Sequence, residues 1–186
     1  MSFKTVSAMS YFKRVFIILI LSAAFLGACN KKSTVRIYGT DTIYNIVHQD
    51  VTYFYYGFSF SQAKLVSTDS NPQPDIVLYL DENDTPSKLI LQANNFLPSF
   101  FKIGEYANED EAKKTFDNLK TVPEPQQWLN MADPVASNQV WVYRSSKEKY
   151  TKFRIVKIED KVEQGKPYAE CTFQWVHQPD GSVNFQ

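Results

Sequence analysis

Residues 13–29 constrain the fold most, because they mark a segment that is expected to be absent from the mature protein. A basic pair, Lys13 and Arg14, precedes an almost wholly apolar run, and the sequence Leu-Gly-Ala-Cys closes the segment at Cys29. A basic start, an apolar centre and small residues before a cleavage point are typical of a secretory signal peptide. The ending has the form of a bacterial lipobox, in which the cysteine becomes the acylated N-terminus. We therefore expect residues 1–28 to be removed as a lipoprotein signal peptide.

A transmembrane helix is the alternative interpretation of this segment. Residues 15–28 are shorter than the ~20 residues that a membrane span requires, and the polar residues 30–34 follow at once. Each buried methylene of an acyl chain adds about 0.8 kcal/mol to membrane binding, so one chain alone binds marginally and two or more chains anchor a protein stably. The sequence predicts a chain attached through Cys29 to the cell envelope, at the outer membrane, with residues 29–34 as a tether. It leaves open which side the domain faces and whether translation starts at Met1 or Met9.

The cysteine content limits how the remaining residues, 35–186, can be stabilised. They have the length of one ordinary domain with a single core. Once Cys29 is acylated, Cys171 has no partner for a disulfide. Cys171 alternates with polar residues and shares a strand face with Phe173 and Trp175, so we predict a buried apolar thiol and not a nucleophile.

Strand patterns dominate the domain. The predicted strands cover residues 35–38, 51–60, 64–67, 75–80, 88–92, 100–103, 139–143, 152–158 and 168–177. Residues 51–60 are dense in aromatic and β-branched side chains, and Gly57 among them indicates a bulge or a close backbone approach. A Pro-Asp-Gly turn at residues 179–181 predicts that the last strand folds back on Val183 and Phe185 as a hairpin.

One segment is helical in pattern. Asn108 is a candidate N-cap, and Glu111 follows at the spacing of a capping box. The apolar stripe consists of Ala112, Phe116 and Leu119. The prediction is a mostly β protein, an antiparallel β domain of the sandwich or barrel type with one short α-helix near residues 109–120.

The sequence lacks the motifs of the common enzyme classes. There is no Gly-rich phosphate loop, His-Glu-x-x-His, Gly-x-Ser-x-Gly or Cys-x-x-Cys. His48 and His177 are the only histidines, too few for a conventional zinc site, so no metal site is predicted. Loss of the signal segment leaves more acidic than basic residues, which argues against a nucleic-acid partner. We predict a protein that is not an enzyme.

Aromatic residues outside the strands are the remaining candidates for a site. Phe96, Phe100 and Phe101 flank Pro98. Tyr106, Trp128 and Met131 flank the helix and a long loop over residues 122–138. Long loops in compact domains are often functional, and apolar side chains on them commonly line ligand or partner sites. A small satellite core beneath the loops is the alternative.

Several of these segments resemble one protein family. The sequence Tyr-Tyr-Gly-Phe-Ser-Phe at residues 55–60, then residues 62–66 and 74–78, resembles the HmuY-like lipoproteins of Gram-negative anaerobes. Residues 149–155 and 172–182 resemble the late strand and the closing hairpin of that family. The resemblance implies a mostly β fold, an outer-membrane anchor and the capture of haem, or a related tetrapyrrole, between two axial side chains.

The resemblance also directs attention to particular side chains. The family's axial ligands are histidines or methionines in the middle and later parts of the domain. The first candidate ligand here is Met131, with Trp128 to stack on the macrocycle, and His177 is the second. His48 and the phenolate of Tyr106 are further candidates. The first hypothesis is a non-enzymatic, membrane-anchored lipoprotein that binds a ligand, with haem or a related tetrapyrrole as the candidate that the resemblance implies. The second hypothesis is a structural or protein-interaction lipoprotein that docks an outer-membrane partner without a small molecule. An enclosed apolar cavity would favour the first hypothesis and a flat exposed patch the second.

Overall fold

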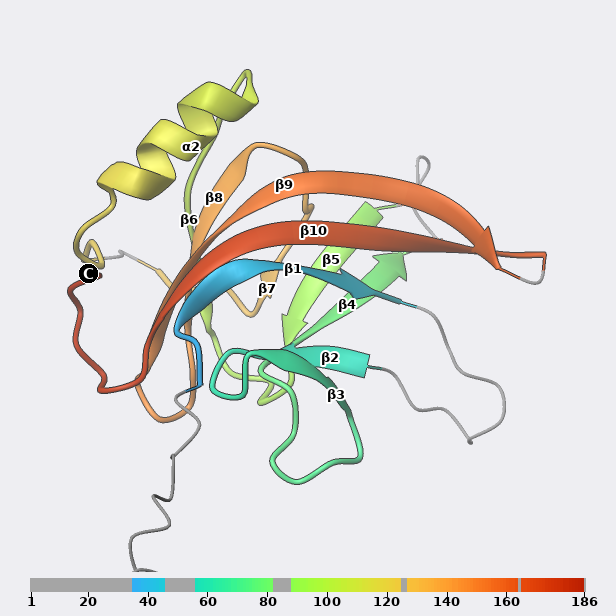
Figure 1. Ribbon diagram of the computed structural model, residues 1–186, viewed down its shortest axis with the longest axis horizontal. Coiled ribbons are helices and arrows are strands. Elements are labelled where there is room, and N and C mark those ends of the chain that lie inside the picture. The colour runs from blue at the N-terminus through green and yellow to red at the C-terminus, as the bar shows by residue number, and fades with distance from the viewer. Residues whose placement is uncertain (1–34, 46–55, 82–87, 125–126, 164, 186) are drawn as a thin grey trace, which may run out of the picture. The chain divides into compact units, whose positions relative to one another are not determined.

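The computed structural model describes residues 35–45, 56–81, 88–124, 127–163 and 165–185 (Figure 1). They belong to one compact unit, Val35–Gln186. Within them, the chain forms two five-stranded antiparallel sheets and one helix. The predicted mostly β class with one short helix is confirmed.

The first sheet joins the beginning of the domain to its end. Its strands, in spatial order, are β1 (Tyr38–Tyr44), β10 (Lys166–Gln178), β9 (Tyr150–Glu163), β8 (Gln139–Arg144) and β6 (Phe100–Glu105). In β1, Tyr38 lies opposite Val176 and Tyr44 opposite Glu170. The first and last strands of the domain are therefore neighbours, as Figure 1 shows.

The second sheet is built from shorter strands. Their order is β3 (Lys64–Ser67), β2 (Tyr56–Ser59), β4 (Ile76–Asp81), β5 (Lys88–Ala93) and β7 (Met131–Ala132). Gly57 in β2 lies so close to Pro74 and to the carbonyl of Ile76 that a Cβ would collide with both. The predicted close backbone approach at Gly57 is confirmed, and it lets β2 and β4 pair.

The core lies between the two sheets and is mainly aromatic. Its largest fully buried side chains include Trp141, Trp175, Phe58, Phe60, Phe100, Phe153 and Phe173. Burying one such side chain contributes about 1.5–3 kcal/mol. Cys171 is fully buried on the same face, and burial raises the pKa of its thiol to about 12, which confirms the prediction of an apolar thiol. Every described core residue lies within the unit Val35–Gln186.

Helix α2 (Glu109–Asn118) covers part of the outer face of the first sheet. Glu111 N donates to Asn108 Oδ1 at 3.0 Å, and Asn108 Nδ2 donates to Glu111 Oε1 at 3.1 Å. The predicted N-cap at Asn108 is confirmed. The arrangement differs from a full capping box, because the Glu111 carboxylate accepts from the side-chain amide of Asn108 and not from its backbone N–H. Ala112 and Phe116 pack on Val140 of β8. The helix ends two residues before the predicted boundary, because Leu119 has an extended backbone.

The first strand and the C-terminal hairpin were predicted wrongly. The first strand begins at Tyr38, where the predicted strand ended. Of the strand predicted at residues 51–60, only the part from Tyr56 lies among the described residues. The C-terminal tail does not form a hairpin with β10. Instead, Val122 N donates to Val183 O at 2.7 Å and Phe185 N to Lys120 O at 2.8 Å. Since β1 and β9 occupy both edges of β10, the tail pairs with the segment after α2.

Candidate functional site

Two loops meet beside the edge strands β6 and β7. One follows β5 and covers residues 94–99, and the other covers residues 127–130. Ser99 N and Phe100 N donate to Leu129 O at 2.8 and 3.0 Å, and Leu129 N donates to Phe100 O at 2.7 Å. Strand β7 continues this connection, with Met131 opposite Gln92 of β5. Backbone hydrogen bonds therefore fix the two loops against each other.

These loops expose four large apolar side chains, which we call the loop patch. They are Phe96, Leu97, Leu129 and Met131, with exposed fractions of 73%, 49%, 38% and 39%. Phe96 has a φ of 56°, a left-handed backbone that a bulky residue rarely adopts. Such a conformation costs on the order of 1 kcal/mol or more, and strain of this kind is often found at functional sites.

Trp128 borders the loop patch and is half-buried. Its ring lies 6.2 Å from that of Phe101 and 6.4 Å from that of Tyr150. The guanidinium of Arg144 lies 4.4 Å from the centre of the indole ring, and its Nη2 donates to the carbonyl of Pro98 at 3.4 Å. Arg144 thus joins Trp128 to the loop that carries Phe96 and Leu97. Part of the indole surface that could stack on a macrocycle is covered by this contact.

The other predicted ligands lie elsewhere. Tyr106 packs with Ala112, Phe116 and Val140 beside α2. His177 is only 4% exposed and stacks on Phe60 in the core at 6.3 Å between ring centres. Among the four candidates, Trp128 in the second loop and Met131 at the start of β7 lie close together in the chain, and the other two lie elsewhere. His48 and the lipidation site Cys29 fall outside the part of the chain that the structure describes.

Burial determines the protonation of His177. Its Nδ1 forms a hydrogen bond of 2.8 Å with Thr151 Oγ1, while the buried Nε2 has no hydrogen-bond partner among the described residues. Burial, and secondarily the positive charge of Lys149, lowers the pKa of His177 to about 4. The imidazole is therefore neutral near pH 7. A metal bound at Nε2 would require the surrounding core to open.

This low pKa predicts a loss of stability in acid. In the unfolded state His177 binds a proton near pH 6.5, whereas in the folded state it does so only near pH 4. The contribution of neutral His177 to the free energy of unfolding is therefore complete above pH 6.5 and declines as the pH falls towards 4. Between pH 7 and pH 4 the wild type should lose about 3 kcal/mol more of its unfolding free energy than His177→Gln does. Urea unfolding at several pH values measures this difference. Equal pH profiles for both proteins would contradict the buried neutral imidazole.

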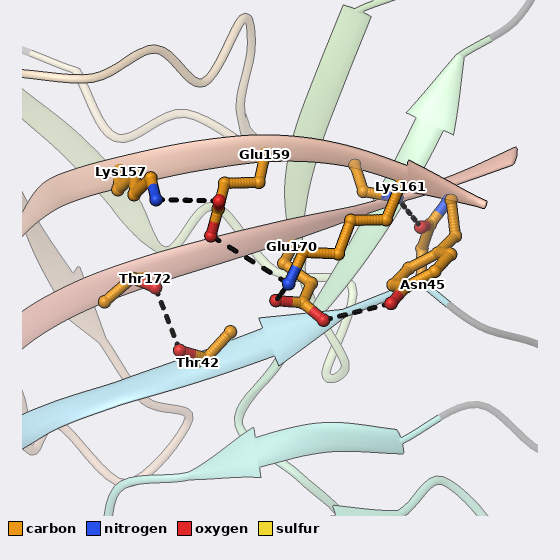
Figure 2. Close-up of polar contacts among 9 residues, drawn as sticks. Thr42, Asn45, Lys157, Glu159, Lys161, Glu170 and Thr172 are labelled. Carbon is orange, nitrogen blue, oxygen red and sulfur yellow. Dashed lines mark hydrogen bonds and ion pairs between the residues drawn. The ribbon is translucent and has the colours of Figure 1, made fainter. Parts of the chain in front are cut away.

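The distal half of the β9–β10 hairpin carries charged side chains on its outer face (Figure 2). Lys157 lies 2.7 Å from Glu159, and Lys161 lies 2.6 Å from Glu170. At the edge strand, Thr42 and Thr172 share a hydrogen bond of 2.9 Å, and Asn45 Oδ1 accepts one from Ala169 N at 2.7 Å. Solvent-exposed ion pairs of this kind contribute little to stability. This face is a solvated surface with no candidate site.

Two cationic side chains on the covered half of the same sheet escaped the sequence analysis. Lys152 and Arg154 alternate with Thr151, Phe153 and Ile155, a pattern that predicts one buried and one solvated face. The structure buries both faces: Lys152 is 4% exposed and Arg154 5% exposed, beneath α2. The amphipathic stripe of the helix was the available signal, since its apolar face had to cover some part of the sheet.

No helix in the described ranges has both the length and the apolar character needed to cross a membrane. The described residues also contain no group of three or more His, Cys, Asp or Glu side chains that could hold a metal ion. No family model matches the chain, and no curated protein matches it. The resemblance to HmuY-like lipoproteins stays a prediction.

Proposed function

We propose that the chain is a lipid-anchored, non-enzymatic protein of the bacterial cell envelope whose loop patch docks an outer-membrane partner protein. The observation that carries the proposal is the exposure of four large apolar side chains on two loops that are fixed by backbone hydrogen bonds. Apolar patches on a protein surface commonly mark interaction sites. The signal segment and Cys29 support the location, because an acyl anchor would hold the domain close to membrane proteins.

Phe96 is the expected centre of the interface. It is the most exposed side chain of the loop patch, so it has the most surface to lose on binding. Its turn is held by hydrogen bonds from Phe96 N to Ala93 O at 3.1 Å and from Leu97 N to Asn95 Oδ1 at 2.9 Å. A rigid aromatic anchor loses little conformational entropy on binding, and such residues commonly dominate interface energies. Arg144, beside Trp128, supplies a polar group at the rim.

Phe96→Gly separates docking from stability. Glycine removes the ring and also accepts the positive φ, so the free energy of unfolding should stay the same or rise by up to about 1 kcal/mol. Docking should weaken by about tenfold or more, the usual effect of losing a central aromatic anchor. Thermal unfolding gives the first quantity. Docking is measured by crosslinking in intact cells from a photoreactive amino acid at position 131. The yield of the adduct is compared between the Phe96→Gly protein and the protein with Phe96.

Val162 provides the matched control. It is 70% exposed, is also apolar, and lies at the far end of β9. A photoreactive residue at position 162 should give no adduct with the protein captured from position 131. Adducts of the same kind from both positions, or an adduct from position 131 that Phe96→Gly does not reduce, would contradict docking through the loop patch.

A tetrapyrrole is the second candidate ligand, and it is favoured by Met131. The Met131 thioether is a soft iron ligand, is 39% exposed and begins β7, directly after the loop that carries Trp128. If haem binds here, titration of residues 31–186 with haemin should give a saturable change in the Soret band at micromolar protein. Met131→Ala should weaken binding and shift the maximum, whereas Cys171→Ala, which alters a fully buried sulfur, should do neither. The absence of a saturable change would remove haem from consideration.

A further inference from the structure

A groove lies on the outer face of the first sheet, between α2 and β1. It has a volume of about 440 Å³, and its lining includes Thr40, Phe116, Lys120, Lys152 and Gln174. Its walls come from the helix and from strands β1, β9 and β10. It is separate from the loop patch, with which it shares no residue.

Lys152 places a positive charge in the lining of this groove. Its Nζ donates to the carbonyls of Phe116 and Leu119 at 2.8 and 2.9 Å, which caps the C-terminus of α2. An ammonium group has three donors, and the third N–H has no hydrogen-bond acceptor within the described ranges, although Nζ lies over the rings of Phe116 and Phe185 at 4.7 and 5.4 Å from their centres. No carboxylate in these ranges lies within ion-pair distance of Lys152. The capping bonds hold the residue rigidly, with one donor left over.

A second cation adds to this charge. Lys120 also lines the groove and has no ion pair with any residue that the structure describes. Burial, followed by the charge of Lys120, lowers the pKa of Lys152 to about 8. Asp117, which also lines the groove, opposes this effect, but its carboxylate is already engaged by Lys113 Nζ at 2.6 Å. The local charge of the groove is therefore positive around neutral pH.

Gln174 supplies neutral donors in a fixed orientation. Arg154 Nε donates to Gln174 Oε1 at 2.7 Å, so the amide nitrogen carries the remaining hydrogen-bonding capacity. That nitrogen has no partner among the residues described. Arg154 is bonded to Glu109 through Nη2 at 3.1 Å, while its buried Nη1 has no partner in the same part of the chain.

We propose that the groove binds a small organic anion that carries a carboxylate or phosphate group beside an apolar portion. The anionic oxygens would accept hydrogen bonds from Lys152 Nζ and Gln174 Nε2, while Lys120 adds charge and the exposed ring of Tyr38, which also lines the groove, contacts the apolar portion. Charge-assisted hydrogen bonds to preorganised donors are the strongest class of polar contact in such sites. Helix capping accounts for two of the donors of Lys152, but it requires neither Lys120 nor the free amide of Gln174.

Benzoate and phenyl phosphate are suitable probes, with benzyl alcohol as the uncharged control. The protein is residues 31–186, which contain the complete described core, after its cooperative unfolding has been verified. At constant ionic strength, each anion should shift the backbone amide signals of Thr40 and Phe116, which line the groove, saturably in nuclear magnetic resonance spectra, and these signals remain available in every variant. The probe that binds more tightly identifies the anionic group as carboxylate or phosphate.

Gln174→Glu is the decisive variant. The new carboxylate still accepts the hydrogen bond of Arg154, but the substitution removes the free amide donors and adds a negative charge to the groove. It should weaken binding of the better probe at least about tenfold with unchanged thermal unfolding. Lys120→Ala should weaken binding by about twofold to fivefold, since an exposed charge is screened. Gln73→Glu adds the same charge on an exposed turn and should leave the affinity unchanged.

Three results would overturn the proposal. They are the absence of saturable binding by either anion, equal binding by benzyl alcohol, and an affinity that Gln174→Glu does not reduce. None of these results bears on the loop patch, whose test uses positions 96, 131 and 162.

Discussion

Phe60→Ala is expected to destabilise the domain by about 3–5 kcal/mol, the usual cost of removing a fully buried phenylalanine. Phe60 follows β2 and is fully buried. Six rings surround it at 5.4–6.5 Å between ring centres: those of Phe58, Tyr143, Phe153, Phe173, Trp175 and His177. These rings come from both sheets, so the resulting cavity would lie where the sheets meet and could not collapse without moving one of them.

Urea unfolding followed by tryptophan fluorescence measures this loss. A domain of this size has a total stability of about 5–15 kcal/mol, so the variant should be close to the limit of folding at 37 °C. Phe96→Ala is the matched control, because it removes the same side chain from a position that is 73% exposed. It should change the free energy of unfolding by no more than about 0.5 kcal/mol. Similar losses in both variants would contradict the placement of Phe60 at the centre of the core.

Cys29→Ala is expected to abolish attachment to the membrane. The substitution removes the thiol that would carry the lipid, and Cys171, the other cysteine, is fully buried and cannot replace it. The domain should still fold, because its described core lies within the unit Val35–Gln186. Fractionation of cells after a high-salt wash, together with labelling by a palmitate analogue, measures both effects.

Cys171→Ala is the control for this experiment and should remain in the membrane fraction with its label. A Cys29→Ala protein that still sediments with membranes after the wash would show that an uncleaved apolar segment, or some other attachment, holds the chain. That result would overturn the lipoprotein proposal and leave the loop patch and the groove to be tested separately.

Local patterns predicted most of the elements well. The boundaries of β3 were predicted correctly, and the start of α2 was fixed by its N-cap, because these signals depend on neighbouring residues only. The tail was predicted wrongly for a physical reason. The Pro-Asp-Gly sequence does reverse the chain, but whether the tail then pairs with β10 depends on the edges of that strand. Those edges are occupied by β1 and β9, which no local pattern could indicate.

The candidate site was predictable only in part. The sequence drew attention to loop aromatics, and Phe96 and Trp128 do lie on two loops that touch. It did not distinguish them from Phe100, which is fully buried, because exposure depends on the register of β6 against β8. The groove was missed altogether. Lys152 and Gln174 belong to strands that look ordinary, and only the position of α2 makes their outer face a site.

The pairing of β1 with β10 has a consequence for the order of events during synthesis. Thr40 lies opposite Gln174, so the first sheet gains its outermost strand only after nearly the whole chain is available. Contacts between such distant residues are slow to form, because a long loop must close before they are made. An exported chain of the kind proposed here would benefit, since a domain that cannot finish folding early remains threadable through a secretion channel. For the same reason, a truncation that removes residues 166–185 should release β1 from the strand with which it pairs, as well as depriving β9 of a partner.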